Sequence, residues 1–158
     1  MMDQTATIDD FDLLAPGLED IRMDLLDQSR DIEALLDQAA TVYNVLVAQE
    51  AEARKVWENA KHVLDLRREQ LLLAEYDKGK DGAINGRNAE IRAKQETAFL
   101  AELPTVHEEY AGLLEQEGIE ATKLEEIQQE LAEAEIKLSG IKYVCRLHTA
   151  RMEMMKPA

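Results

Sequence analysis

The stretch Asp77-Lys-Gly-Lys-Asp-Gly-Ala-Ile-Asn-Gly-Arg-Asn88 decides how this chain is expected to fold. It contains three of the seven glycines and separates two long segments in which apolar residues recur at helical spacing. Glycine and asparagine readily adopt the positive φ angles that tight turns require, and glycine weakens helices. We therefore predict a loop over residues 78–87 that reverses the chain between two long helices.

The segment before the loop has the heptad spacing of a coiled-coil helix. Pro16 suits a first helical position, and no proline or glycine interrupts residues 18–77. The line of residues expected to face a partner helix consists of Leu18, Ile21, Leu25, Gln28, Ile32, Leu35, Ala39, Val42, Leu46, Gln49, Ala53, Val56, Ala60 and Val63. We predict one helix over residues 16–77, preceded by an acidic flexible tail over residues 1–15.

The segment after the loop predicts a second helix over residues 88–155, with Asn88 as its N-cap. Its strictest apolar line runs through Leu124, Ile127, Leu131, Ala134, Leu138, Ile141, Cys145, His148, Met152 and Met155. Pro104 lacks an amide donor, so we expect a kink near residues 100–104. Gly118 is a second candidate break, because Thr122 and Glu125 have the spacing of a capping box.

Two helices of similar length joined by a short loop predict an all-α fold, a long antiparallel helical hairpin that packs as a coiled coil. Residues 16–158 would then form a single domain. The glycines of the loop favour this turn over a swapped dimer with straight helices, although both remain open. Further apolar residues lie off the expected seam: Leu26, Leu36, Tyr43, Val47, Trp57, Leu72, Leu100, Leu114, Ile136, Tyr143 and Leu147. This second face predicts either a homo-oligomeric bundle, with a dimer favoured, or docking against a larger partner.

Charge and cysteine content limit the partners and the compartment. The formal net charge is −15, which repels nucleic-acid phosphates and anionic membrane surfaces. The first fifteen residues have no basic region typical of a leader, and no uncharged apolar run reaches the ~20 residues of a spanning helix. With a single cysteine, Cys145, no disulfide is needed. We expect a cytoplasmic protein that binds neither nucleic acid directly nor membranes.

The loop partly follows the calcium-binding pattern of an EF-hand. Asp77, Asp81 and Asn85 occupy ligand positions of that pattern. Gly79 and Asn88, however, stand where an oxygen ligand and a bidentate glutamate are required. These three residues are therefore weak metal candidates, and we expect the loop to serve as a turn with no metal or other cofactor.

Other chemistry-bearing patterns are incomplete. Cys145 and His148 lie three residues apart, but no second Cys or His pair completes a zinc site. No Glu lies three residues before a histidine, as a di-iron bundle would require, and no nucleophile–base arrangement or nucleotide-binding motif is present. We therefore expect no enzymatic activity.

The segment Gly82-Ala-Ile-Asn-Gly-Arg-Asn-Ala-Glu-Ile-Arg-Ala-Lys-Gln95 resembles a motif of small helical proteins of bacteriophages and prophages, G-x-x-x-G-x-N-A-E-x-R-x-x-Q. The resemblance covers fourteen residues and transfers no catalytic residue. It implies a phage accessory protein, some of which are encoded near recombination or replication genes. The residues at the tip that we expect to bind a partner are Asn85, Arg87, Asn88, Glu90, Arg92 and Gln95. The alternative role of these residues is to cap and stabilise the loop.

Three functions remain as hypotheses. The first is a non-enzymatic coiled-coil scaffold or adaptor that binds a protein partner. The second is an acidic inhibitor that mimics DNA or blocks the basic groove of a nucleic-acid enzyme, which the net charge motivates. The third is a weak calcium-responsive hairpin.

Overall fold

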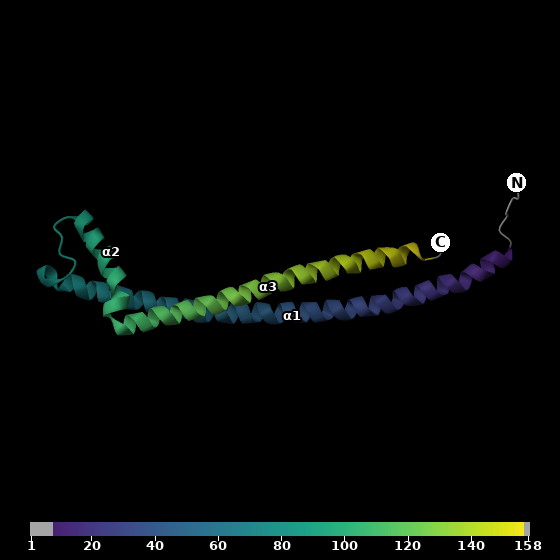
Figure 1. Ribbon diagram of the computed structural model, residues 1–158, viewed down its shortest axis with the longest axis horizontal. Helices are drawn as coiled ribbons and strands as arrows, with labels where there is room; N and C mark the ends of the chain where they lie inside the picture. Colours follow the sequence, from purple (N-terminus) through teal and green to yellow (C-terminus); the bar gives the residue numbers. More distant parts are fainter. Residues whose placement is uncertain (1–7, 157–158) are drawn as a thin grey trace. The chain divides into compact units, whose positions relative to one another are not determined.

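The computed structural model describes the backbone of residues 8–156 and the side chains of residues 21–156 (Figure 1). Three α-helices account for most of this part of the chain: α1 (Ile8–Asp77), α2 (Ala89–Val106) and α3 (Glu108–Met154). A short 3₁₀ helix, η1 (Gly79–Asp81), lies in the loop, and residues 8–156 contain no strand. The predicted all-α class is confirmed.

α1 begins earlier than expected. Residues 8–15, which we assigned to a flexible tail, belong to the helix, while residues 1–7 lie outside the described part. Pro16 therefore lies inside α1 instead of opening it. Asp9, Asp10 and Asp12 stand near the helix N-terminus, where the macrodipole favours negative charge, and this effect was not weighed for the tail. The helix ends at Asp77, as predicted.

The second predicted helix is divided at His107. This residue has an extended backbone (φ −124°, ψ 101°), and Pro104 lies in the last turn of α2. The His107 Nδ1 atom accepts a hydrogen bond from the Tyr110 backbone N–H at 3.1 Å. The ring therefore caps the start of α3. The disruption comes just after residues 100–104 because Pro104 removes an amide donor from the last turn of α2 and the His107 cap then starts a new helix.

The additional break considered at Gly118 is absent: α3 is continuous through this residue. The Thr122 hydroxyl donates to the Gly118 carbonyl oxygen at 3.0 Å, a bond within the helix that replaces the expected cap. The capping-box spacing was therefore misleading here, since the same hydroxyl can bond one turn back along its own helix.

The chain divides into two compact units, and residues 16–158, predicted as one domain, are shared between them. Unit 1 comprises residues 1–46 and 131–158, and unit 2 comprises residues 47–130. In the described part of unit 1, α1 and α3 run antiparallel. His148, a buried residue, places its Nε2 atom 2.8 Å from the Leu25 carbonyl oxygen.

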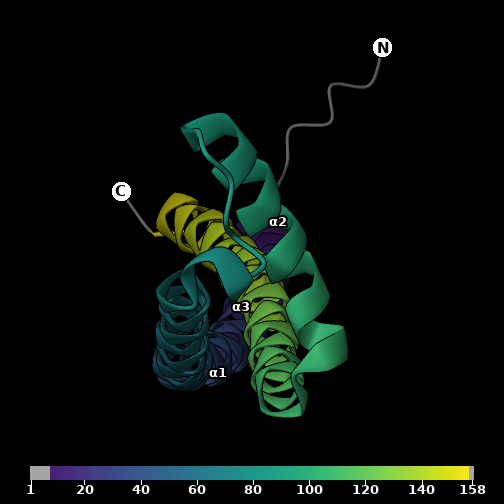
Figure 2. The ribbon, with the colours of Figure 1, turned by 90° about the vertical axis from the view of Figure 1, so that its left-hand side faces the viewer.

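Unit 2 contains the end of α1, the loop, α2 and the start of α3. Its core is formed by Leu64, Leu103 and Tyr110, of which Leu103 is only 2% exposed. Figure 2 views the loop end, with the loop crossing from α1 to α2. The antiparallel register of α1 and α3 is marked by two hydrogen bonds. The Trp57 Nε1–H donates to Glu117 at 2.8 Å, and the Gln128 amide donates to Glu50 at 3.3 Å.

The face that α1 turns towards α3 is only half of the predicted seam. Within each unit, the less exposed positions of α1 recur in steps of three and four: Leu25, Ser29, Ile32, Leu36, Ala39, Tyr43 and Leu46 in unit 1, and Glu50, Ala53, Trp57, Ala60 and Leu64 in unit 2. Leu36, Tyr43 and Trp57, which we had placed off the seam, thus belong to it. By contrast, Val56 and Val63 are about two-fifths exposed.

The predicted line on α3 is correct. Each of its residues from Leu124 to Met155 is buried or half-buried, whichever unit it belongs to. Heptad spacing alone was ambiguous on α1, because three of its seven heptad positions are largely apolar. A wide stripe of that kind is typical of helices with more than one neighbour in a bundle.

Candidate functional site

The loop that joins α1 to α2 is held by side chains at its two ends. Gly79 is the only residue of the described chain with a positive φ (+62°), and it directs the backbone out of α1 into η1. From there the chain runs to Asn88, the N-cap of α2. We call residues 75–96 the tip, and its contacts are described from α1 onward.

Glu75, in the last turns of α1, binds the loop from the α1 side. Its carboxylate accepts hydrogen bonds from the Lys78 ammonium at 2.9 Å and from the Ala83 backbone N–H at 2.7 Å. These two bonds, that of Lys78 first, lower the pKa of Glu75. Gly82 lies so close that an added Cβ would be 2.5 Å from the Glu75 carbonyl oxygen. Glu75 was not predicted from the sequence, although its position one turn before the loop was a usable signal.

Gln95, in α2, binds the loop from the α2 side. Its Oε1 atom accepts from the backbone N–H groups of Asn85 at 3.0 Å and Gly86 at 2.8 Å. Its Nε2 atom donates to the Asn85 Oδ1 atom at 3.0 Å. The Asn85 amide in turn donates to the Lys80 carbonyl oxygen at 3.2 Å. One glutamine therefore satisfies two loop amides that no helix could satisfy.

The start of α2 completes the network. The Asn88 Oδ1 atom accepts from the Ile91 backbone N–H at 2.9 Å, as the N-cap prediction requires. The Arg92 guanidinium donates to the Gly86 carbonyl oxygen at 3.3 Å. An added Cβ on Gly86 would lie 2.5 Å from the Ile91 Cγ2 atom, so only glycine fits.

One further bond ties α2 directly to α1. The Tyr76 hydroxyl donates to the Glu96 carboxylate at 2.9 Å. This bond raises the pKa of Tyr76, because the neighbouring carboxylate disfavours a phenolate. Neither residue was selected from the sequence, since nothing in the spacing links residues in different helices.

The six predicted partner-binding residues therefore fall into two groups. Asn85, Asn88, Arg92 and Gln95 are used to fold the tip. Arg87 and Glu90 are exposed, and Glu90 forms a surface ion pair with Lys94 at 3.4 Å, in which both side chains are about four-fifths exposed. Five of the exposed charged residues at and beside the loop form what we call the tip surface: Lys80, Asp81, Arg87, Glu90 and Lys94.

The weak calcium candidates do not form a prepared site. The side chain of Asn85 is engaged by Gln95 and the Lys80 carbonyl oxygen. Among the residues with described side chains, no group of three or more His, Cys, Asp or Glu residues is placed to hold a metal ion. Asp77 and Asp81 remain as separate acidic residues at the end of α1 and in η1.

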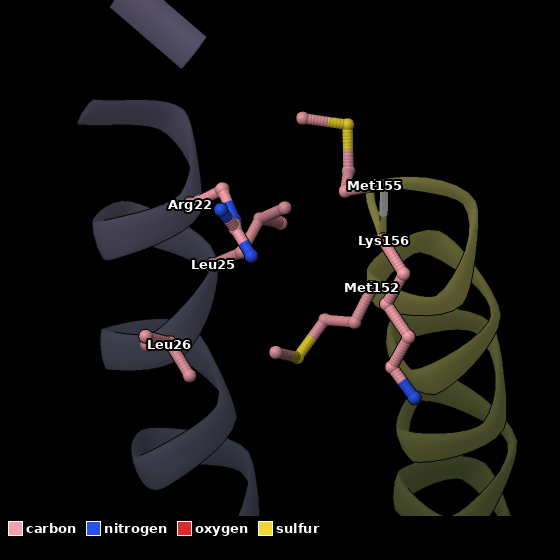
Figure 3. Close-up of a pocket in the computed structure, with 6 residues that line it drawn as sticks. All are labelled: Arg22, Leu25, Leu26, Met152, Met155 and Lys156. Carbon is pink, nitrogen blue, oxygen red and sulfur yellow. The ribbon is translucent and has the colours of Figure 1, made fainter. Parts of the chain in front are cut away.

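A cavity of about 150 Å³ lies in unit 1, near the C-terminal end of α3 (Figure 3). The residues that line it are Arg22, Leu25, Leu26, Met152, Met155 and Lys156. Cys145 and His148 do not line it, and His148 instead bonds to the Leu25 carbonyl oxygen. The cavity has an apolar lining with two cationic residues, and it contains none of the predicted site residues.

Neither a family model, nor a curated protein, nor a solved structure matches this chain. Within the described residues, no helix is long and apolar enough to cross a membrane.

Proposed function

We propose that this chain is a non-enzymatic helical adaptor that binds a protein partner through the tip surface. One observation carries the proposal. The distinctive side chains of the loop motif point into the tip and fix it, so that five charged side chains of both signs stand on a preformed support. Preorganised surfaces bind with a smaller ordering cost than mobile loops do.

The nature of the partner follows from the charge of this surface. The tip surface combines the cations Lys80, Arg87 and Lys94 with the acids Asp81 and Glu90. It is therefore mixed in sign, although the chain carries a net charge of −15. Mixed charges suit electrostatic complementarity with a protein surface, which selects a partner and its orientation. The resemblance of the tip to phage accessory proteins supports a protein of phage recombination or replication as the partner class.

The experiment is a crosslinking pull-down from lysate of the native host. A surface variant, Arg87→Glu with Lys94→Glu, leaves the loop hydrogen bonds in place. A folding variant, Asn88→Ala with Arg92→Ala, removes two of them. The matched control is Lys142→Glu with Arg146→Glu, a double charge reversal at two exposed positions of α3.

We expect one protein to be captured by wild type and by the control, and to be lost with both tip variants. Capture by the surface variant at wild-type level would contradict the proposal. Recovery of the chain alone by wild type would contradict it as well.

A second candidate function has its own observation. Between Glu108 and Glu135, α3 carries ten glutamates and one lysine, and most of these glutamates are exposed. A regular array of carboxylates on a helix favours the binding of a basic, DNA-binding groove. We infer an inhibitor of a nucleic-acid enzyme as the alternative function. It predicts that DNA competes with the chain for the target, and that rising salt weakens the complex.

A further inference from the structure

Unit 2 contains a second apolar line on α1 that no other helix of the unit covers. Its six residues recur in steps of three and four, and we call them the outer seam: Val56, Asn59, Val63, Leu66, Gln70 and Leu73. Its four apolar side chains are 41 to 63% exposed, whereas Leu64, on the neighbouring inner face, is 3% exposed. Exposed apolar side chains that recur along one face of a charged helix indicate an interaction surface.

The outer seam also borders a hollow that a helix could enter. A cavity of about 260 Å³ runs along its first half, between α1 and α3. The residues that line it are Val56, Asn59, Ala60, Val63, Leu113, Gln116 and Glu120. Its floor is apolar, and Glu120 is already bonded to Gln116 at 2.9 Å and to Lys123 at 3.3 Å. An apolar helix face can therefore approach without facing an unpaired carboxylate.

We propose that the outer seam binds the outer seam of a second copy of this chain, with the two α1 helices antiparallel. The residue order of the seam reads as a palindrome in chemical type: apolar, amide, apolar, apolar, amide, apolar. In a two-fold symmetric antiparallel pair, each contact is made twice. The pairs are Val56 with Leu73, Asn59 with Gln70, and Val63 with Leu66. Every apolar residue thus meets an apolar residue, and every amide meets an amide.

Shifting the two antiparallel helices by one heptad destroys this pairing of apolar with apolar and amide with amide residues. A shift of one heptad in one direction places Val63 against Asn59 and Gln70 against Glu52 of the second copy. A shift in the other direction places Leu66 against Gln70. Each shift buries an amide against an apolar side chain, and an unpaired buried amide is costly. The palindrome therefore selects one antiparallel register.

In a parallel pair, each residue of the outer seam would meet the same residue of the second copy, so the chemical types would match as well. The flanking charges therefore decide the direction. In the antiparallel pair His62 of one helix lies beside Glu69 of the other, and this contact is also made twice. In the parallel pair His62 would lie beside Arg67. Both His62 and Glu69 are exposed in the chain and free to meet a second helix. On the other flank of the seam, Ala53, Ala60 and Ala74 are small, and Arg67 is paired with Glu109 of α3 at 3.3 Å.

The seam spans eighteen residues, about 27 Å of helix, which is short for an obligate interface. The dimer should therefore dissociate on dilution. This inference does not depend on the tip surface, because no tip residue belongs to the outer seam. The adaptor function and the dimer can thus fail separately.

The test uses disulfide crosslinking of the full chain with Cys145→Ser as the background. Asn59→Cys and Gln70→Cys each replace an exposed amide. An equimolar mixture should give a crosslinked dimer containing one of each chain, and either variant alone should give at least tenfold less. Crosslinking of each variant with itself would show a parallel pair and overturn the proposal. The absence of any crosslink would also overturn it.

A charge exchange provides an independent readout by sedimentation. Val63→Lys and Leu66→Glu should each be monomeric at concentrations where wild type is dimeric. Their mixture should recover the dimer, because the lysine introduced in one chain then meets the glutamate introduced in the other. Helicity measured by circular dichroism should equal that of wild type for each variant. Dimers of either variant alone, or no recovery in the mixture of helical variants, would contradict the register.

Discussion

The tip and the outer seam are both part of unit 2, but they differ in whether their side chains already have partners within the chain. At the tip, the polar side chains Asn88, Arg92 and Gln95 bond to backbone groups of the tip itself. Along the outer seam, Val63 and Leu66 remain 41 and 48% exposed. A distinctive motif can therefore serve folding, while an ordinary heptad pattern provides the surface left open to a partner.

The largest expected effect comes from truncating a core leucine, compared with the same truncation on the outer seam. Leu103→Ala removes a side chain that is 2% exposed, and should lower the free energy of unfolding by about 2–5 kcal/mol. Leu73→Ala removes one that is 63% exposed, and in dilute solution should change it by less than about 0.5 kcal/mol. Urea denaturation measures both. Equal losses would mean that the outer seam is covered within the chain.

A glycine substitution tests how tightly the tip is packed. Gly86→Ala places a Cβ against Ile91, a stiff branched side chain, and should destabilise the chain by about 1–3 kcal/mol. The control is Gly112→Ala, since Gly112 lies within α3 with open space around its Cα. There alanine should stabilise the helix by about 0.5–1 kcal/mol. Two changes of the same sign would contradict the account of the tip.

Loss of the α2 cap should have a smaller effect. Asn88→Ala removes the acceptor of the Ile91 N–H, and should cost about 1 kcal/mol of unfolding free energy. Asn88→Asp keeps a capping oxygen and should preserve most of it. Thermal unfolding compares the two variants. If aspartate were as harmful as alanine, the side chain of Asn88 would have a role other than capping.

Acidification should give the smallest effect on the tip. Hydrogen bonds from Lys78 and the Ala83 N–H lower the pKa of Glu75 in the folded chain. The contribution of Glu75 is therefore complete above its unfolded pKa and is lost as the pH falls through the folded value. Exchange of the Ala83 amide should accelerate over that acidic range, and Glu75→Gln should remove most of the pH dependence. An unchanged profile in Glu75→Gln would contradict this assignment.

Much of the architecture could be predicted because its determinants are local. The end of α1 at Asp77 and the cap at Asn88 follow from loop residues and capping chemistry, and both are confirmed. The line on α3 was also predictable, because its spacing of three and four residues is unbroken from Leu124 to Met155. The oligomeric bundle stays a prediction.

The remainder depends on contacts between segments distant in sequence. The face of α1 was misplaced because three heptad positions are apolar, and spacing cannot tell which two of them α3 covers. The second predicted helix is interrupted at His107 because the His107 ring accepts a hydrogen bond from the Tyr110 N–H. Residue preferences do not suggest this cap. Gln95 was selected as a partner-binding residue because the sequence does not show that its amide is bonded to the loop.

Hydrogen–deuterium exchange of the wild-type chain, measured at a high and a low protein concentration, tests the central contrast most directly. We predict that the amides of Ala83, Asn85 and Gly86 are protected equally at both concentrations, because their acceptors lie within the chain. Residues 56–73 should be protected more strongly at the high concentration, where a second copy covers the outer seam. Rapid exchange of the three loop amides, or concentration-independent protection of residues 56–73, would contradict the account.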